Sequence, residues 1–263
     1  MEYLPDRNSR YKDVDYWDER YKTEKSFEWF GDFSKFQHLL QRHVMKDDAI
    51  LVLGCGNSSM SSDMYDAGYH SITNIDYSSV CIDTMSARHD ATCPGMTWHQ
   101  MDARQLSFTD ASYDVVLEKG TLDAMLVEEK DPWKVSTETA CLIDQVLREE
   151  QQKFAVTAST GILHLCFRIS RVLKPGGRFL SVTFAQPHFR KRLYARHDYC
   201  WSIRTRSYGD GFQYFLYVLT KGEELSPEDV TLERRLLEEA QDPPNEVRTQ
   251  EADTESFLYC IDL

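Results

Sequence analysis

The sequence predicts an α/β fold with a doubly wound, mostly parallel sheet of seven strands that closes with a C-terminal antiparallel hairpin. Short apolar runs alternate with helical patterns from residue 50 to residue 184, as they do where parallel strands are joined by crossover helices. The first run, Ile50–Leu53, stops at a glycine, which is typical of a buried parallel strand. The last two runs flank Tyr208-Gly209-Asp210-Gly211, a sequence that indicates a β-hairpin turn.

Each element is predicted from its own local pattern. Trp17 and Tyr21 lie one turn apart on the first helix. Pro175-Gly176-Gly177 is a helix-stop and turn signal that closes a long helical stretch ending at residues 172–174. The expected strands are Ile50–Leu53, Ser71–Ile75, Thr97–Gln100, Tyr113–Glu118, Arg178–Phe184, Trp201–Arg206 and Phe212–Thr220. The other expected helices are Val14–Tyr21, Phe36–Val44, Ser58–Ala67, Ser79–His89 and Val230–Ala240.

Composition and charge narrow the class of protein. Hydrophobic residues make up 41% of the 263 residues, so the chain can bury a sizeable core. It has 30 basic and 43 acidic residues and a net charge of −13. A surface of this sign repels phosphate backbones and anionic membranes, so we expect no nucleic-acid and no membrane partner. No run approaches the ~20 apolar residues of a membrane span, and the N-terminus lacks the order of a signal peptide.

The cysteines show no paired spacing and no histidine partners at zinc-site intervals. An odd, scattered set is typical of reduced thiols inside the cell. We therefore expect no structural disulfide, no metal site and a cytoplasmic location. The seven residues are Cys55, Cys81, Cys93, Cys141, Cys166, Cys200 and Cys260.

The loop Gly54-Cys55-Gly56-Asn57 after the first strand is the most informative segment. Glycines there let the backbone approach a ligand without interference from Cβ atoms. The loop lacks the third glycine of the dinucleotide fingerprint and the lysine of a P-loop, so it serves a pyrophosphate poorly.

Acidic residues follow three further strands. Asp76 ends the second strand 20 residues after Gly56, where an acid accepts hydrogen bonds from a ribose diol. Asp102, next to Met101, is positioned to accept from the amino group of adenine, and Glu118 closes the fourth strand. Ligands of open α/β sheets bind outside the carboxyl ends of the strands, so all these residues face one crevice. A ribose-binding acid without a pyrophosphate loop predicts S-adenosylmethionine rather than NAD.

Together these motifs resemble the class I methyltransferases, which have a Rossmann-like sheet of seven strands. The resemblance covers residues 11–222 and is carried by the glycine loop, Asp76, Asp102, the strand YDVVLEKG and LKPGG before the fifth strand. The segments YWDERY, WFGDF, LVLGCGNS, IDYSS, EKGTLDA and YGDGFQYFLYVL are similar to one narrower family, the methyltransferases of lysine in translation elongation factor 1-alpha.

The resemblance implies a protein-lysine N-methyltransferase that uses S-adenosylmethionine, acts on elongation factor 1-alpha and needs no metal. Residues 1–222 would form the catalytic domain, with a helical lid over residues 11–45, and residues 223–263 an acidic tail. We expect a monomer, and no residue can be assigned as a general base. The cofactor contacts implied at matching positions, with Gly56 added from the loop itself, are Trp17, Tyr21, Gly54, Gly56, Asp76, Tyr77, Met101, Asp102 and Glu118.

Other interpretations stay open. Asp76 and Asp102 are of a type that also caps turns, and the aromatic pair on the first helix is also typical of a core. The protein could instead methylate a small molecule, or bind the cofactor as an inactive interaction protein. The last interpretation depends on residues 150–168, which interrupt the family pattern between DQVLRE and SRVLKPGG, beside the expected substrate side.

Overall fold

The computed structural model describes residues 4–129 and 169–241, together with residues 136, 140, 141, 143, 146 and 147. The predicted insertion at 150–168 and the end of the acidic tail lie outside the described residues. The strands are β1 Ile50–Leu53, β2 Ile72–Asp76, β3 Met96–Gln100, β4 Tyr113–Lys119, β5 Leu173–Thr183, β6 Trp201–Tyr208 and β7 Tyr214–Lys221. The helices of the described residues include α1 Val14–Thr23, α2 Phe33–Leu40, α3 Met60–Asp66, α4 Ser79–His89, α5 Thr121–Met125, α7 Ile169–Val172, α8 Pro187–Tyr194 and α9 Pro227–Gln241, with 3-10 turns η1 Asn8–Lys12 and η2 His197–Tyr199.

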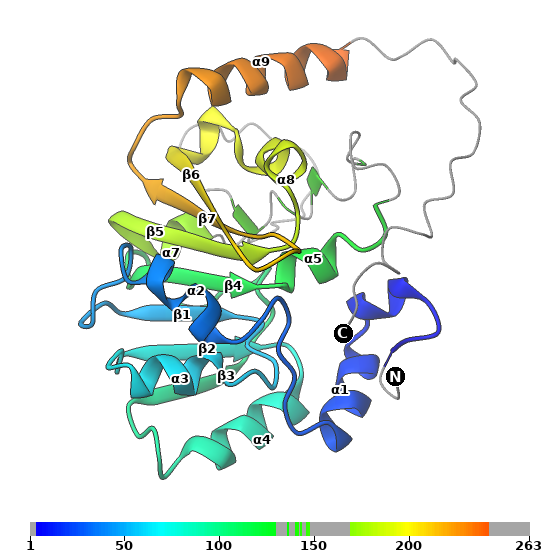
Figure 1. Cartoon of the computed structure of the whole chain (residues 1–263), viewed down its shortest axis with the longest axis vertical. Coiled ribbons are helices and arrows are strands. Elements are labelled where there is room, and N and C mark those ends of the chain that lie inside the picture. The colour runs from blue at the N-terminus through cyan, green and yellow to red at the C-terminus, as the bar shows by residue number, and fades with distance from the viewer. Residues whose placement is uncertain are drawn as a thin grey trace, which may run out of the picture.

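The sheet has the predicted doubly wound topology, with strand order β3-β2-β1-β4-β5-β7-β6 (Figure 1). Strands β1 to β5 pair in parallel, whereas β7 pairs antiparallel with both β5 and β6. The chain runs outward from β1 to β3 and then returns to β4 on the other side of β1. The point where the strand order reverses therefore lies between β1 and β4, which is where open α/β sheets bind their ligands.

Two hydrophobic clusters cover the two faces of this sheet. Ile50 and Val52 of β1 belong to the first cluster, with side chains from α2, α3 and α4. Leu51 and Leu53 belong to the second cluster, with side chains from α7 and α8. Because successive strand residues point to opposite faces, the continuous apolar run of β1 is buried on both sides, as predicted.

Strand β5 starts earlier than predicted. The helix ends at Val172, and Leu173 already pairs with Tyr113 of β4. The next paired residues are Val115 and Arg178, so the register shifts and the extra residues on β5 form a bulge. Gly176, with φ of 74°, lies in this bulge. The prediction of a helix through residues 173 and 174 was therefore wrong, because the proline-glycine segment bends a strand instead of separating a helix from one.

The carboxyl ends of the parallel strands meet at one edge of the sheet, where α1 and α5 also lie, on the right of Figure 1. The β6–β7 turn reaches the same edge, because β6 runs in the direction of the five parallel strands. Helix α9 begins at Pro227, after the predicted domain end at residue 222, and contains the predicted helix Val230–Ala240. Among the described residues, no helix combines the length and the apolar character needed to cross a lipid bilayer.

Candidate functional site

The glycine loop between β1 and α3 has the left-handed backbone that its glycines allow. Gly54 and Gly56 have φ of 59° and 53°, a region that side chains with a Cβ disfavour. A Cβ at Gly54 would also lie 2.4 Å from the hydroxyl oxygen of Thr121. That hydroxyl donates to the carbonyl oxygen of Leu53 at 2.8 Å and so joins the end of β1 to the start of α5. Glycine at position 54 is thus required by close packing at the switch point.

Asp76 stands at the end of β2 beside this loop and is buried, with 4% of its surface exposed. One carboxylate oxygen accepts the backbone N–H of Gly56 at 3.0 Å, and the other accepts that of Ser78 at 3.0 Å. A carboxylate can accept about four hydrogen bonds, and the backbone N–H of Tyr77 also acts on this one, so some capacity remains for a hydroxyl of a ribose. Asp76 therefore lies beside the glycine loop at the end of β2, as predicted, and it also makes the turn-capping contact with Ser78 that the sequence left open.

Burial raises the pKa of Asp76 from 3.8 to about 6, against the opposing effect of its backbone hydrogen bonds. The ionised form is the better acceptor, so we expect cofactor affinity to be constant above pH 7 and to fall about tenfold per pH unit below pH 6. Calorimetric titrations between pH 5 and pH 8 would measure this. In Asp76→Asn the step should vanish, and a step that persists in that variant would assign it to another group.

Helix α1 covers the glycine loop with the two predicted aromatic residues. Trp17 and Tyr21 are buried, and their rings stack at 5.5 Å. The hydroxyl oxygen of Tyr21 lies 3.1 Å from the position of a Cβ on Gly56, so α1 closes directly over the loop. Trp17 donates its indole N–H to the carbonyl oxygen of Tyr11 at 2.8 Å. The pair therefore belongs to the core and covers the glycine loop at the same time.

Asp102 and Tyr77 lie at the outer end of the crevice, after β3 and β2. The Asp102 carboxylate accepts hydrogen bonds from the guanidinium of Arg104 at 2.5–3.0 Å and from its backbone N–H at 2.8 Å. Burial raises the pKa of Asp102, but the bonds and charge of Arg104 outweigh burial, and the net shift is downward. Met101 donates its N–H to the carbonyl oxygen of Asp76 at 2.9 Å, which holds the ends of β2 and β3 together.

Glu118 is fully buried at the end of β4, and its carboxylate is engaged inside the fold. It accepts the N–H groups of Thr121 and Leu122 at 3.0 and 3.2 Å, and the hydroxyl of Ser181. Burial first, and then the charge of Asp123, raises its pKa to about 7. Glu118 thus holds the start of α5, and with it Gly120 and Thr121, against the sheet.

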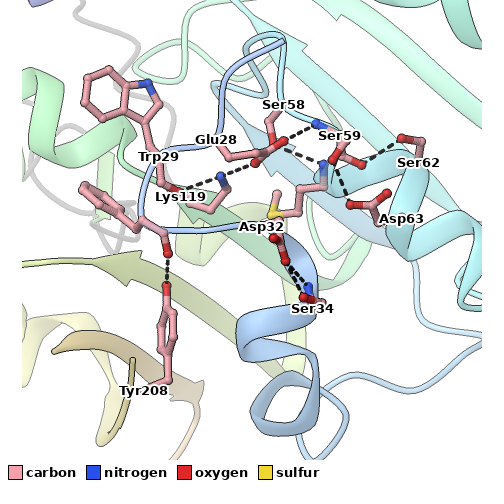
Figure 2. Close-up of polar contacts among 12 residues, drawn as sticks. Glu28, Trp29, Asp32, Ser34, Ser58, Ser59, Ser62, Asp63, Lys119 and Tyr208 are labelled. Atoms are coloured by element: carbon pink, nitrogen blue, oxygen red, sulfur yellow. Dashed lines mark hydrogen bonds and ion pairs between the residues drawn. The ribbon is translucent and has the colours of Figure 1, made fainter. Parts of the chain in front are cut away.

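An ion pair between Glu28 and Lys119 also lies at this edge of the sheet, and the sequence did not predict it. Lys119 donates to the Glu28 carboxylate at 2.8 Å and to the carbonyl oxygen of Trp29 at 2.9 Å. Glu28 also accepts from the hydroxyl of Ser58 at 2.7 Å and from the N–H of Ser59 at 2.5 Å. Figure 2 shows Glu28 between Lys119 and these serines. The segment after α1 is thereby fastened to the end of β4 and to the start of α3. No local signal marks this pair, because its members are 91 residues apart.

Aromatic side chains line the sheet edge from the end of β4 to the β6–β7 turn. Phe30 packs against Gly120, where a Cβ would lie 3.3 Å from its ring. Its ring lies 5.5 Å from that of Phe184 and 5.7 Å from that of Tyr214. The ring of Tyr214 also lies 5.2 Å from the ring of Phe212, which is in the β6–β7 turn. We call Phe30, Phe184, Phe212 and Tyr214 the aromatic strip.

The backbone of Phe30 is held in an unusual conformation. Its φ is 60°, in the left-handed region that bulky residues rarely adopt. Tyr208 fixes it by donating its hydroxyl to the Phe30 carbonyl oxygen at 2.8 Å (Figure 2). Non-glycine residues in this region cost about 1–3 kcal/mol and concentrate at functional sites. The strained backbone of Phe30 therefore marks the aromatic strip as a candidate part of the site.

The residues at this edge fit a nucleoside cofactor that carries no phosphates. Asp76 is a buried acceptor, and after burial the main influence that raises its pKa is the negative charge of Asp18. The glycine loop Gly54-Cys55-Gly56-Asn57 contains no lysine or arginine that could bind a phosphate. Trp17, Tyr21 and Tyr77 supply the apolar surface that a purine and a sulfonium group need.

Comparison with known proteins places the chain among methyltransferases. A family profile described as "Methyltransferase domain" matches residues 50–145. EEF1A lysine methyltransferase 4 of Bos taurus is 44% identical over 263 residues, which cover 99% of this chain and 95% of that protein. The same protein of Mus musculus is 43% identical with the same coverage. The eEF1A lysine and N-terminal methyltransferase of Homo sapiens is 35% identical over 73% of this chain and 24% of its own length.

Solved structures share the fold at low sequence identity. The N-methyltransferase NodS from Bradyrhizobium japonicum, in complex with S-adenosyl-L-homocysteine, has a TM-score of 0.53 at 12% identity and covers 82% of this chain and 100% of its own. The [4+2]-cyclase SpnF has a TM-score of 0.52 at 13% identity and covers 81% and 94%. A cyclase and a methyltransferase on one scaffold illustrate that such a fold does not define the reaction.

Proposed function

Because this chain belongs to the EEF1A lysine methyltransferase 4 family, we propose that it transfers methyl groups from S-adenosylmethionine to a lysine side chain of EEF1A. It is a methyltransferase with S-adenosylmethionine as its cofactor. The single observation that carries the assignment of EEF1A as the substrate is the full-length match to relatives named for that substrate. The geometry at the carboxyl edge of the sheet also supports methyl transfer there. A cytoplasmic location stays a prediction.

In this proposal the cofactor lies across the carboxyl ends of β1, β2 and β4. Asp76 accepts from its ribose, while Gly54 and Gly56 let the backbone approach it. Trp17 and Tyr21 of α1 cover it and exclude water. The adenine end lies toward Tyr77, Met101 and Asp102, where Arg104 orients the Asp102 carboxylate. Glu118 contributes indirectly, because it fixes the start of α5 next to the cofactor.

When bound, the cofactor supplies an electrophilic methyl group. The chain has to line up an amine behind that methyl group, which is an effect of positioning. The amine must be neutral, although a free lysine has a pKa of ~10.4. Apolar walls lower this pKa because they desolvate the ammonium. The aromatic strip provides such walls beside Gly120, and we assign the lysine approach to it.

The carboxylates of Glu118, at the end of β4, and Asp123, in α5, are not well placed to remove the proton of the ammonium. The oxygens of Glu118 bond to backbone N–H groups and a serine hydroxyl. Asp123 accepts from Thr183 at 2.7 Å and pairs with Arg190. Both are tied into the fold, so the proposed mechanism loses the proton to solvent and uses no general base.

The proposed function is tested by incubating the purified chain with radiolabelled S-adenosylmethionine and purified EEF1A. We expect label in EEF1A, and peptide mass spectrometry should place it on lysine. An EEF1A variant with arginine at the mapped lysine serves as the control and should stay unlabelled. Transfer to a metabolite extract but not to EEF1A would favour the small-molecule alternative, and binding without any transfer would favour an inactive interaction protein.

The lysine approach along the aromatic strip gives a separate prediction. Phe212 is 48% exposed, so Phe212→Ala should leave the fold and cofactor affinity unchanged. It should raise KM for EEF1A about fivefold to tenfold with little change in kcat, which corresponds to about 1–1.4 kcal/mol of lost contact. Leu237→Ala on α9 is the matched control, because Leu237 is also 48% exposed. Equal KM values for the two variants would contradict the assignment.

A further inference from the structure

Three metal-ligating side chains from separate segments meet beneath the glycine loop. The thiols of Cys55 and Cys81 and the carboxylate of Asp76 lie within 4.8 Å of one another, and all three residues are buried. Cys55 comes from the glycine loop, Asp76 from the end of β2 and Cys81 from the first turn of α4. The sequence predicted no metal site because no two of these residues have the spacing of a zinc motif. The fold alone brings them together.

This donor set suits a thiophilic divalent cation. Zinc binds two thiolates and a carboxylate readily, with Zn–S distances of ~2.3 Å and ligand atoms roughly 3.8 Å apart around a tetrahedral ion. Side-chain movements of about 1 Å would therefore bring the three ligand atoms into range.

Charge also favours a cation here. The carboxylate of Asp76 is buried, and the hydrogen bonds that it accepts in the described structure come from neutral backbone N–H groups. After burial, the negative charge of Asp18 is the main influence that raises its pKa. A divalent ion occupies this position by displacing the protons of the two thiols to solvent, and it then pairs the carboxylate with a positive centre instead of leaving it isolated in the interior.

We infer that Cys55, Asp76 and Cys81 form an inhibitory site for a thiophilic divalent cation such as zinc or cadmium. The ion and the cofactor exclude each other, because coordination withdraws the Asp76 carboxylate from the ribose and draws in the glycine loop through Cys55. The exclusion rests on the proposed role of Asp76 in cofactor binding, whereas the metal site itself rests on the three side chains alone.

Cadmium is the probe, because its bonds to thiolates give an ultraviolet charge-transfer absorption. Titration of the full chain should show one cation bound through two thiolates. Cys81→Ser should lower the absorption of the bound ion and weaken its binding at least tenfold. Cys93→Ser is the matched control, since Cys93 is also a buried free cysteine but lies outside the group. Cys81→Ala keeps the position apolar and tests the same point if the serine variant folds poorly.

Competition completes the test. At a cofactor concentration ten times its own dissociation constant, S-adenosylmethionine should weaken cadmium binding about tenfold. Identical cadmium spectra and affinities for wild type, Cys81→Ser and Cys81→Ala would overturn the metal site. Cadmium binding that depends on Cys81 but is not weakened by S-adenosylmethionine would overturn the proposed inhibition. Failure of EEF1A methylation would instead count against the proposed function, because the cadmium titration involves no methyl transfer.

Discussion

Asp76→Asn is expected to weaken S-adenosylmethionine binding about 100-fold, or ~2.7 kcal/mol. The amide keeps one acceptor oxygen, but its NH2 group would face one of the two backbone N–H groups that now donate to the carboxylate. The charge-assisted bonds to the ribose would be lost as well. Calorimetry at pH 7.5 measures the effect.

The matched control for that substitution is Asp90→Asn, because Asp90 is exposed at the end of α4, the helix that follows Asp76. This variant should bind the cofactor like the wild type. An Asp76→Asn protein that is folded and binds within threefold of the wild type would contradict the ribose assignment.

Arg190→Leu is expected to destabilise the protein by about 3–5 kcal/mol, since it leaves a buried carboxylate without its cation. Arg190 is 2% exposed and pairs with Asp123, and it also donates to the Thr183 hydroxyl at 2.9 Å. Its positive charge opposes the burial that raises the pKa of Glu118 and Asp123. Urea unfolding followed by circular dichroism measures the loss.

Two further variants separate this ion pair from helix packing in general. Arg235→Leu on α9 breaks a contact with the half-exposed Glu239, and the Arg235 side chain is itself 63% exposed, so it should cost about 1 kcal/mol or less. The double variant Arg190→Leu/Asp123→Leu removes both charges and should recover much of the loss. Equal destabilisation by the double variant and Arg190→Leu would show that packing, not charge, determines the effect.

Local sequence patterns were sufficient for most of the sheet. Ile50–Leu53, the helix over residues 79–89 and the final hairpin each carry a complete signal within about ten residues. Asp76 was found for a similar reason, because its distance from Gly56 is a property of one strand-helix-strand unit. The start of β5 was missed because a bulge, which only the partner strand reveals, accommodates the proline and glycines.

Contacts between distant segments could not be predicted from those patterns. The Glu28–Lys119 pair spans 91 residues and the Arg190–Asp123 pair spans 67. The aromatic strip joins residues from both ends of the described chain. Glu118 was expected near the cofactor because of its place at a strand end. Its burial beneath α5 depends on which way its side chain points, and the sequence alone does not determine that direction.

The central claim is that the carboxyl edge of this sheet binds an adenosine cofactor without phosphates. Calorimetric titration of the purified chain with S-adenosylmethionine and, separately, with NAD tests it most directly. The account predicts saturable binding of S-adenosylmethionine at one site per chain and no binding of NAD. Binding of NAD in preference, or of neither ligand by a folded protein, would contradict it.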